Sequence, residues 1–202
     1  MVQAHAFAAE IETTRVTIDV DAAVRVEAGV FSYSEAAAAL NRVGYALDTS
    51  TERAYRYSRG ADIVDLMVPD HERPPPRHAL RDVMPVTAGK QAMRRLQFMH
   101  FDDGGVPVAV PVPNLHGALV LKAAALQVDQ RDRARHLLDA ITLMACIEDV
   151  EPIVASTRGS DRQRLMYLLN EFDDQLLIAA QAPTDTVQLA RRTAEDLRRG
   201  LT

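Results

Sequence analysis

Two aspartates in an apolar run are the residues of this 202-residue chain best suited to chemistry. Asp19 and Asp21 lie in residues 15–24, RVTIDVDAAV, a segment whose β-branched residues predict a strand. Side chains alternate between the two faces of a strand, so Thr17, Asp19 and Asp21 are expected on one face, with the carboxylates roughly 6 to 7 Å apart. A bound divalent cation would offset their repulsion. The alternative is a strand end with two solvated carboxylates.

A third carboxylate stands in another apolar segment with strand character. Asp65 lies in residues 62–68, DIVDLMV. Paired strands lie about 4.8 Å apart, so Asp65 would join Asp19 and Asp21 if the two segments are neighbours. Mg²⁺ prefers a few carboxylates supplemented by water and substrate phosphates. The three carboxylates therefore predict a two-metal site, in which one ion activates a hydroxyl and the other neutralises a polyphosphate leaving group. Asp62, close to Gly60, is expected to be a turn residue instead.

Two charged residues interrupt apolar, helical segments further along the chain. Lys122 lies in residues 115–126, LHGALVLKAAAL. It is either a cation for a triphosphate or a lysine whose ammonium reaches the surface at the helix edge. Asp139 lies in residues 135–143, RHLLDAITL, with Arg135 four residues earlier. Asp139 would pair either with Arg135 within its own helix or with Lys122 across two packed helices, where it would orient the lysine.

The elements expected in the first half of the chain are short and mixed. Helix formers dominate residues 2–11, and a helix is expected over residues 34–43, with Ser32 or Ser34 as its N-cap. A proline-rich, irregular excursion is expected over residues 70–88. Besides the two strands that carry the aspartates, strands are expected at residues 45–47, 54–58, 94–101 and 106–112, the last two joined by the turn DDGG.

The second half is expected to be helical, over residues 115–128, 133–147, 160–181 and 184–199, with Ser160 and Asp161 suited to an N-cap. Together the elements predict an α+β fold, with a small mixed β-sheet, helices on one side of it, and a C-terminal helical bundle. We expect two domains, residues 1–112 and residues 113–202, the second completing the active site.

The composition limits the class of protein. With 48% hydrophobic and 25% charged residues, the chain resembles an ordinary globular protein. It has no apolar run of 18 residues and no signal-peptide pattern, so a cytoplasmic location is expected. Cys146 is the only cysteine, which excludes a disulfide framework and a cysteine metal cluster, and it is expected to be buried. The net charge of -5 excludes a global attraction to nucleic acid, although a local basic patch remains open.

Several short motifs together resemble a known family. They are RVTIDVD at residues 15–21, YRYSRG at residues 55–60 leading into IVDL, VPNL at residues 112–115 running into KAAA at residues 122–125, and RHLLD at residues 135–139. In this order and spacing, the chain resembles the AbiEii-like nucleotidyltransferases, which are toxins of bacterial toxin–antitoxin systems with a polymerase β-type minimal fold. The resemblance covers roughly residues 1 to 150.

The resemblance implies a reaction and a role for each site residue. The reaction is the transfer of a nucleoside monophosphate from an NTP to a hydroxyl of tRNA or protein, with release of pyrophosphate. Asp19 and Asp21 would coordinate Mg²⁺, and Asp65 would be the third carboxylate, which activates the acceptor hydroxyl. Lys122 would stabilise the triphosphate, and Asp139 would position Lys122 or contribute to the site.

Other positions are candidates for contacts with the phosphates or the acceptor. Thr17 would lie beside the nucleotide phosphates. Arg15, Arg56 and Arg59 are candidates for phosphate or acceptor contacts, with solvated surface arginines as the alternative. A cognate antitoxin is a further expected partner.

One feature of the family is missing from the printed sequence. Family members carry a Gly-Gly or Gly-Ser turn just before the helix that leads to the aspartate strand, whereas this sequence starts with MVQAH. Such a turn brings backbone N–H groups to phosphates, so either the protein starts upstream of this sequence or its nucleotide binding is weaker. The alternative to an enzyme is therefore a catalytically idle module that keeps the fold and serves in binding or regulation.

Overall fold

The computed structural model describes residues 1–13, 19–24, 32–71 and 75–202. The chain divides into two compact units. We call Thr17–Met93 the sheet unit, and Met1–Val16 together with Arg94–Thr202 the helical unit. The first helix and the hairpin of residues 96–113 therefore cluster with the C-terminal helices, whereas we had expected them in a first domain of residues 1–112. The α+β class is confirmed.

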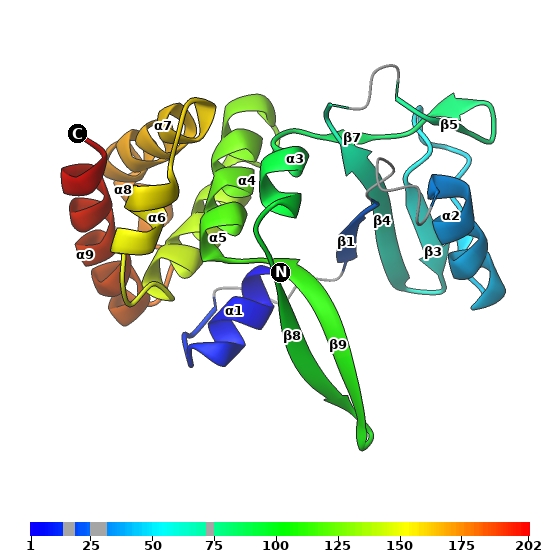
Figure 1. The fold of residues 1–202 in the computed structure, drawn as a ribbon, viewed down its shortest axis with the longest axis horizontal. Coiled ribbons are helices and arrows are strands. Elements are labelled where there is room, and N and C mark those ends of the chain that lie inside the picture. The colour runs from blue at the N-terminus through cyan, green and yellow to red at the C-terminus, as the bar shows by residue number, and fades with distance from the viewer. Residues whose placement is uncertain (14–18, 25–31, 72–74) are drawn as a thin grey trace. The chain divides into compact units, whose positions relative to one another are not determined.

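The sheet unit contains a mixed five-stranded sheet (Figure 1). Four strands follow the order β1-β4-β3-β2, and β7 pairs with the far end of β4. Strand β1 is parallel to β4, whereas β3 is antiparallel to both β4 and β2. The strands and helices of this unit are β1 (Asp19–Ala23), α2 (Tyr33–Arg42), β2 (Ala46–Leu47), β3 (Arg56–Arg59), β4 (Asp62–Pro69), β5 (Arg77–His78), β6 (Arg81–Asp82), β7 (Pro85–Val86) and α3 (Gly89–Met93).

The two faces of the sheet have different environments. On one face, Tyr57, Leu66 and Val68 pack in a core with Tyr33 and Ala37 of α2. The hydroxyl of Tyr33 donates to the carbonyl of Ala54 at 2.8 Å, which ties the helix to the segment that leads into β3. Since side chains alternate along a strand, the aspartates of β1 and β4 lie on the opposite face. Helix α2 therefore packs on the face of the sheet that is opposite to the carboxylates.

Helix α2 begins with a capping box. The Ser32 hydroxyl accepts from the backbone N–H of Glu35 at 3.2 Å, and the Ser32 N–H donates to the Glu35 carboxylate at 2.6 Å. Of the two serines that the sequence offered as caps, Ser32 is the cap and Ser34 lies inside the helix. The helix ends at Arg42, and Gly44 follows with a φ of +89°, a conformation that favours glycine.

We expect Ser32→Ala to lower the free energy of unfolding by about 1 kcal/mol, because an N–H of the first turn would lose its acceptor. Ser34→Ala is the matched control, since it removes a hydroxyl one residue inside the helix, and it should change the stability by less than about 0.5 kcal/mol. Urea denaturation followed by circular dichroism measures both. Equal effects of the two substitutions would contradict the assignment of Ser32 as the cap.

The helical unit consists of a hairpin and seven helices in the described part of the chain. Helix α5 packs against α4, α9, α8, α7 and α1, so it lies at the centre of the unit (Figure 1). Its buried face includes Leu137, Ile141, Leu143 and Met144. The elements are α1 (Val2–Ala8), β8 (Leu96–Asp103), β9 (Val106–Pro113), α4 (Leu115–Val128), α5 (Arg133–Ala145), α6 (Glu151–Ser156), α7 (Ser160–Asp174), α8 (Leu176–Ala179) and α9 (Thr184–Leu201).

Some helices differ from the expectation. The helix expected over residues 160–181 is interrupted at Gln175, whose ψ of 49° is not helical, so that α7 and α8 are separate. Ser160 and Asp161 are the first helical residues of α7, and the N-cap is Gly159, so the expected cap was wrong. The short helices α3 and α6 were not expected. Proline at the start of α6 fits a helix start, because its missing N–H has no helical acceptor there.

Cys146 is buried, as expected, at the end of α5. Burial raises the pKa of its thiol to about 11, so the thiol is unreactive at neutral pH. Among the described residues, every helix is too short or too polar to cross a lipid bilayer.

Candidate metal centre

The three aspartates expected to form a site converge in the sheet unit. The parallel register of β1 and β4 places Asp21 opposite Asp65, and Asp19 lies two residues before Asp21 on the same face. One carboxylate oxygen from each aspartate lies within 4.8 Å of the other two. That spacing is comparable to twice the metal–oxygen distance for Mg²⁺ or Ca²⁺, roughly 4 to 5 Å. The expected convergence is therefore confirmed, and the oxygen ligands suit a hard divalent cation.

The three carboxylates differ in burial. Asp65, on the central strand β4, is only 7% exposed, whereas Asp21 on β1 is exposed and Asp19 is intermediate. Buried carboxylates are costly to keep ionised unless they are paired. Asp65 is the carboxylate that most needs a partner, and Asp21 is the one most open to water.

Arg56 supplies the partner of Asp65. Its Nε donates to Oδ1 of Asp65 at 2.8 Å, and its Nη2 donates to Oδ2 at 2.7 Å. Such a two-pronged contact fixes the plane of the carboxylate as well as its position. The contact with Asp65 also raises the pKa of the Arg56 guanidinium, so Arg56 is permanently charged. Arg56, a candidate for phosphate or acceptor contacts, thus binds a carboxylate of the site.

The register of three strands explains this contact. Asp21, Asp65 and Arg56 are opposite one another on β1, β4 and β3, so they form one row across the sheet. Residues in one row of a sheet project from the same face. The row therefore brings two negative charges and one positive charge together, with Asp19 adding a third negative charge nearby.

The structure does not bring Arg59 to the carboxylates. Arg59 lies three residues after Arg56, on the other face of β3, at the turn that joins β3 to β4. Its guanidinium donates to Asp62 and to the carbonyl of Val43, and it stacks on the Tyr45 ring at 4.7 Å. Asp62, expected to be a turn residue, is the first residue of β4, directly after the turn of Gly60 and Ala61. Arg15 and Thr17, the other candidates for contacts with phosphates, lie outside the described residues.

Lys122 and Asp139 form a buried ion pair in the helical unit. Lys122 Nζ lies 2.7 Å from Asp139 Oδ2, and their side chains are only 13% and 10% exposed. The pairing expected between two packed helices, α4 and α5, is present, and the ammonium of Lys122 ends on Asp139 rather than in water. Arg135, the other candidate partner of Asp139, lies 4.0 Å from Asp132 one turn before it.

His136 lies one turn from Asp139 on α5. Its Nε2 is 3.2 Å from a carboxylate oxygen of Asp129. Burial lowers the pKa of His136, the contact with Asp129 opposes this shift, and the positive charge of Lys122 adds to it. The imidazole is therefore neutral at pH 7. It does not place a second positive charge beside the ion pair of Lys122 and Asp139.

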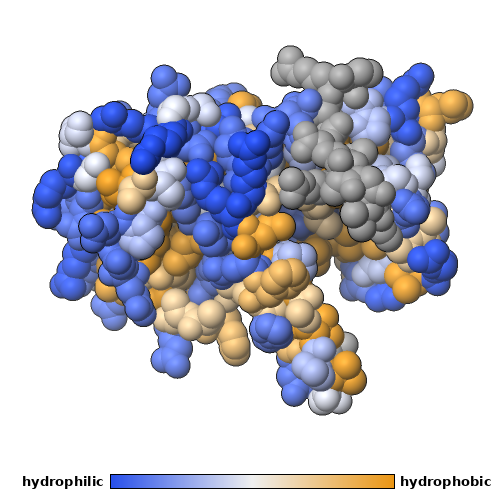
Figure 2. Space-filling view, viewed as in Figure 1, coloured by the Kyte–Doolittle hydropathy of each residue, from blue (hydrophilic) through white to orange (hydrophobic). Residues whose placement is uncertain are grey.

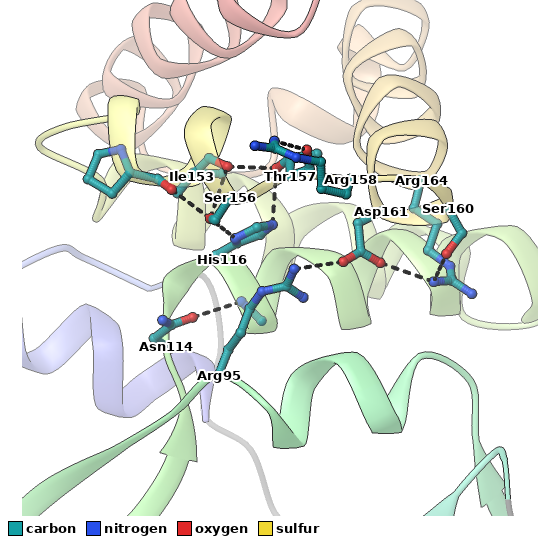
Figure 3. A network of polar contacts seen from close by, with 12 residues as sticks. Arg95, Asn114, His116, Ile153, Ser156, Thr157, Arg158, Ser160, Asp161 and Arg164 are labelled. Atoms are coloured by element: carbon teal, nitrogen blue, oxygen red, sulfur yellow. Dashed lines mark hydrogen bonds and ion pairs between the residues drawn. The ribbon is translucent and has the colours of Figure 1, made fainter.

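A second polar network in the helical unit surrounds the buried His116 of α4 (Figure 3). Its Nδ1 lies 3.0 Å from the Ser156 hydroxyl, and its Nε2 lies 3.1 Å from the Thr157 hydroxyl. Nearby, Arg95 forms an ion pair of 2.8 Å with the buried Asp161. His116 ties α4 to the end of α6, and Arg95, just before β8, ties the start of the hairpin to the start of α7. Local sequence patterns do not predict this network, because its members are far apart along the chain.

Comparisons with known proteins do not identify the chain. No family model, no curated protein and no solved structure matches it.

Proposed function

We propose that this protein is a Mg²⁺-dependent nucleotidyltransferase. The observation that carries the proposal is the convergence of three carboxylate oxygens, from Asp19, Asp21 and Asp65, within 4.8 Å on one face of the sheet. An arrangement of this kind holds Mg²⁺ together with substrate phosphates. The motif resemblance to AbiEii-like toxins supports the choice of reaction, the transfer of a nucleoside monophosphate from an NTP to a hydroxyl of tRNA or protein.

Each residue of the proposed site would have its own role in the reaction. Asp19 and Asp21 would hold the metal, and Asp65, fixed by Arg56, would be the third ligand and the acceptor for the proton of the attacking hydroxyl. Bound Mg²⁺ supplies positive charge that stabilises the developing charge on the phosphates. The resemblance assigns Lys122 to the triphosphate, and the contact with Asp139 would fix the direction of its ammonium.

We expect Asp21→Asn to lower nucleotide transfer at least a hundredfold, about 2.7 kcal/mol in the barrier, because the neutral amide is a poor metal ligand. The assay incubates the purified protein with Mg²⁺, each labelled NTP in turn, and total tRNA, and follows label in RNA and in protein. Asp62→Asn is the matched control, since Asp62 is an exposed aspartate on the same strand as Asp65, bound to Arg59. Equal labelling by wild type and Asp21→Asn would refute the role of the triad.

The proposed role as the toxin of a bacterial toxin–antitoxin pair rests on the motif resemblance. Expression of the wild-type chain in a bacterial host should then arrest growth, and expression of Asp21→Asn should not. Normal growth with an active wild-type enzyme would refute the toxin role and leave the nucleotidyltransferase.

The second candidate is a catalytically idle module with the same fold. The contact between Arg56 and Asp65 favours it, because both oxygens of the most buried carboxylate already accept hydrogen bonds from the protein. Isothermal titration with Mn²⁺ and the transfer assay together separate the two. Metal binding that is lost in Asp19→Asn and Asp21→Asn supports a metal site, and the complete absence of nucleotide transfer by the wild type would then favour the idle module.

A further inference from the structure

The β8–β9 hairpin of the helical unit exposes an unusual amount of apolar surface. It is a sheet of only two strands in the described part of the chain. Phe98 is 67% exposed and Val106 is 62% exposed, and Leu96, Phe101, Val108 and Val110 are also exposed. Apolar residues are visible along the hairpin in the space-filling view (Figure 2). Two-stranded hairpins are marginally stable alone, and additional strands stabilise them.

The direction of the backbone groups follows from the register. Asn114 donates its N–H to the carbonyl of Arg95 at 2.7 Å, so residue 95 points its backbone groups toward the partner strand. In an antiparallel pair this direction alternates, so Leu96, Phe98, His100 and Asp102 point their backbone N–H and C=O groups away from β9. On β9 the residues opposite them are Pro113, Pro111, Ala109 and Pro107.

The two outer edges of the hairpin therefore differ. On β9, three of the four outward positions are prolines, which have no N–H to donate, so this edge cannot accept another strand. On β8, all four outward positions have an N–H. One edge is closed to strand addition and the other is open.

The two ends of the open edge of β8 carry opposite charges. Arg94, just before β8, is exposed and positive, and Asp102, near the tip of the hairpin, is exposed and negative. Between them, residues 96–101, LQFMHF, include no lysine, arginine, aspartate or glutamate. A second strand of the same sequence that runs antiparallel would place a positive end beside a negative end twice. A parallel copy would place like charges together.

We propose that two copies of this chain associate through the outer edges of β8, antiparallel, to form a four-stranded sheet. The register that places Arg94 opposite the partner's Asp102 has its two-fold axis at Phe98, and it places the two Phe98 rings side by side on one face. Aromatic pairs and opposite charges across neighbouring strands both stabilise a sheet. The commitment to a second copy rests on this self-complementary charge pattern.

A single cysteine tests the geometry. Residues directly opposite in a hydrogen-bonded antiparallel pair have Cα atoms about 5.5 Å apart, within the range for a disulfide. Phe98→Cys is therefore expected to form a disulfide-linked dimer in mild oxidant, and Cys146 does not compete because it is buried. Val106→Cys is the matched control, since Val106 is also exposed and apolar but lies on β9. Non-reducing electrophoresis should show a dimer at least tenfold more abundant for Phe98→Cys.

Sedimentation velocity over a range of concentrations tests the association of the native chain, which should be a concentration-dependent dimer. His100→Pro removes one outward N–H from each copy and should weaken the dimer about tenfold or more, whereas His100→Ala keeps the N–H and should weaken it less. Arg94→Asp and Asp102→Arg should each weaken it, and the double variant should restore it. A monomer at all concentrations, together with equal crosslinking of the two cysteine variants, would overturn the proposal.

The dimer is independent of the proposed catalysis. It uses residues of β8 in the helical unit, whereas the three carboxylates belong to the sheet unit. His100→Pro can therefore lose the dimer while Mn²⁺ binding at the triad is unchanged, so the failure of one proposal is distinguishable from the failure of the other.

Discussion

Replacement of Asp139 by alanine is expected to lower the free energy of unfolding of the helical unit by about 3 to 5 kcal/mol. Lys122 and Asp139 are in contact at 2.7 Å, and both side chains are largely withdrawn from water. Removal of the carboxylate would leave the ammonium buried without its counter-charge. The cost of an uncompensated buried charge exceeds the net stabilisation that the pair itself gives, because forming the pair also removed both ions from water.

Three further variants separate this explanation from others. The double substitution Lys122→Met and Asp139→Leu removes both charges and should be close to neutral, within about 1.5 kcal/mol, since apolar groups of similar size replace them. Asp132→Ala, at the residue just before the same helix, is the surface control, because Asp132 is 57% exposed and lies 4.0 Å from Arg135. It should change the stability by less than about 1 kcal/mol.

Urea denaturation followed by helical circular dichroism measures these differences. A cost below about 1 kcal/mol for Asp139→Ala would mean that the lysine reaches water when its partner is removed. That outcome would favour the alternative interpretation, in which Lys122 lies at the edge of its helix and its ammonium reaches the surface.

The pairing of Lys122 with Asp139 can be predicted from the sequence, because the loop that connects their two helices is short. Four residues, 129–132, join α4 to α5, and a short loop between helices places them antiparallel. Lys122 lies seven residues before this loop and Asp139 seven residues after it, so the two are level with each other. The apolar neighbours of both residues indicate burial, and the equal spacing places Lys122 opposite Asp139, a criterion that the choice between Arg135 and Lys122 had lacked.

The contact between Arg56 and Asp65 could have been found in the same way. Gly60 and Ala61 form a two-residue turn between β3 and β4, which places Arg59 opposite Asp62. Counting back three residues on one strand and forward three on the other reaches Arg56 and Asp65. The motif resemblance favours phosphate contacts for Arg56, whereas the register favours the nearer partner, the carboxylate of Asp65 on the next strand.

The network around His116 could not be predicted from the sequence. His116 and its hydroxyl partners are about forty positions apart, and α6, which carries Ser156, was not expected as a helix. Local patterns do not specify how helices that are distant in the sequence pack, because that depends on the packing of the whole core. The convergence of Asp19 and Asp21 with Asp65 was predictable only as a consequence of strand pairing, which the apolar character of both segments favoured.

The stability of the helical unit is expected to fall by up to about 3 kcal/mol between pH 6.5 and pH 4 because of His116. Burial lowers the pKa of His116 from 6.5 to about 4, the charge of Arg95 adds to this shift, and Asp161 opposes it. Above pH 6.5 the imidazole is neutral in both the folded and the unfolded chain, so its full contribution is present. Between pH 6.5 and pH 4 the unfolded chain binds a proton and the folded chain does not, so unfolding becomes progressively easier.

The hydrogen bonds of His116 can accommodate a neutral ring. The Ser156 hydroxyl donates to the carbonyl of Pro152 at 2.6 Å, and the Thr157 hydroxyl donates to the carbonyl of Ile153 at 2.7 Å. A neutral imidazole has one donor and one acceptor nitrogen, so one hydroxyl accepts from the ring, and the other donates to the ring only if it gives up its bond to the carbonyl. Protonation of the ring would instead place a positive charge in the core near Arg95.

His116→Gln provides the control for this pH dependence, because glutamine keeps a donor and an acceptor but does not titrate. The free energy of unfolding, measured in urea at several pH values from 7.5 to 4, should have a shallower slope in His116→Gln than in the wild type. Burial also lowers the pKa of His5 and His136, so a part of the slope should remain in the variant. Parallel curves for the two proteins would show that folding does not lower the pKa of His116, and would contradict this prediction.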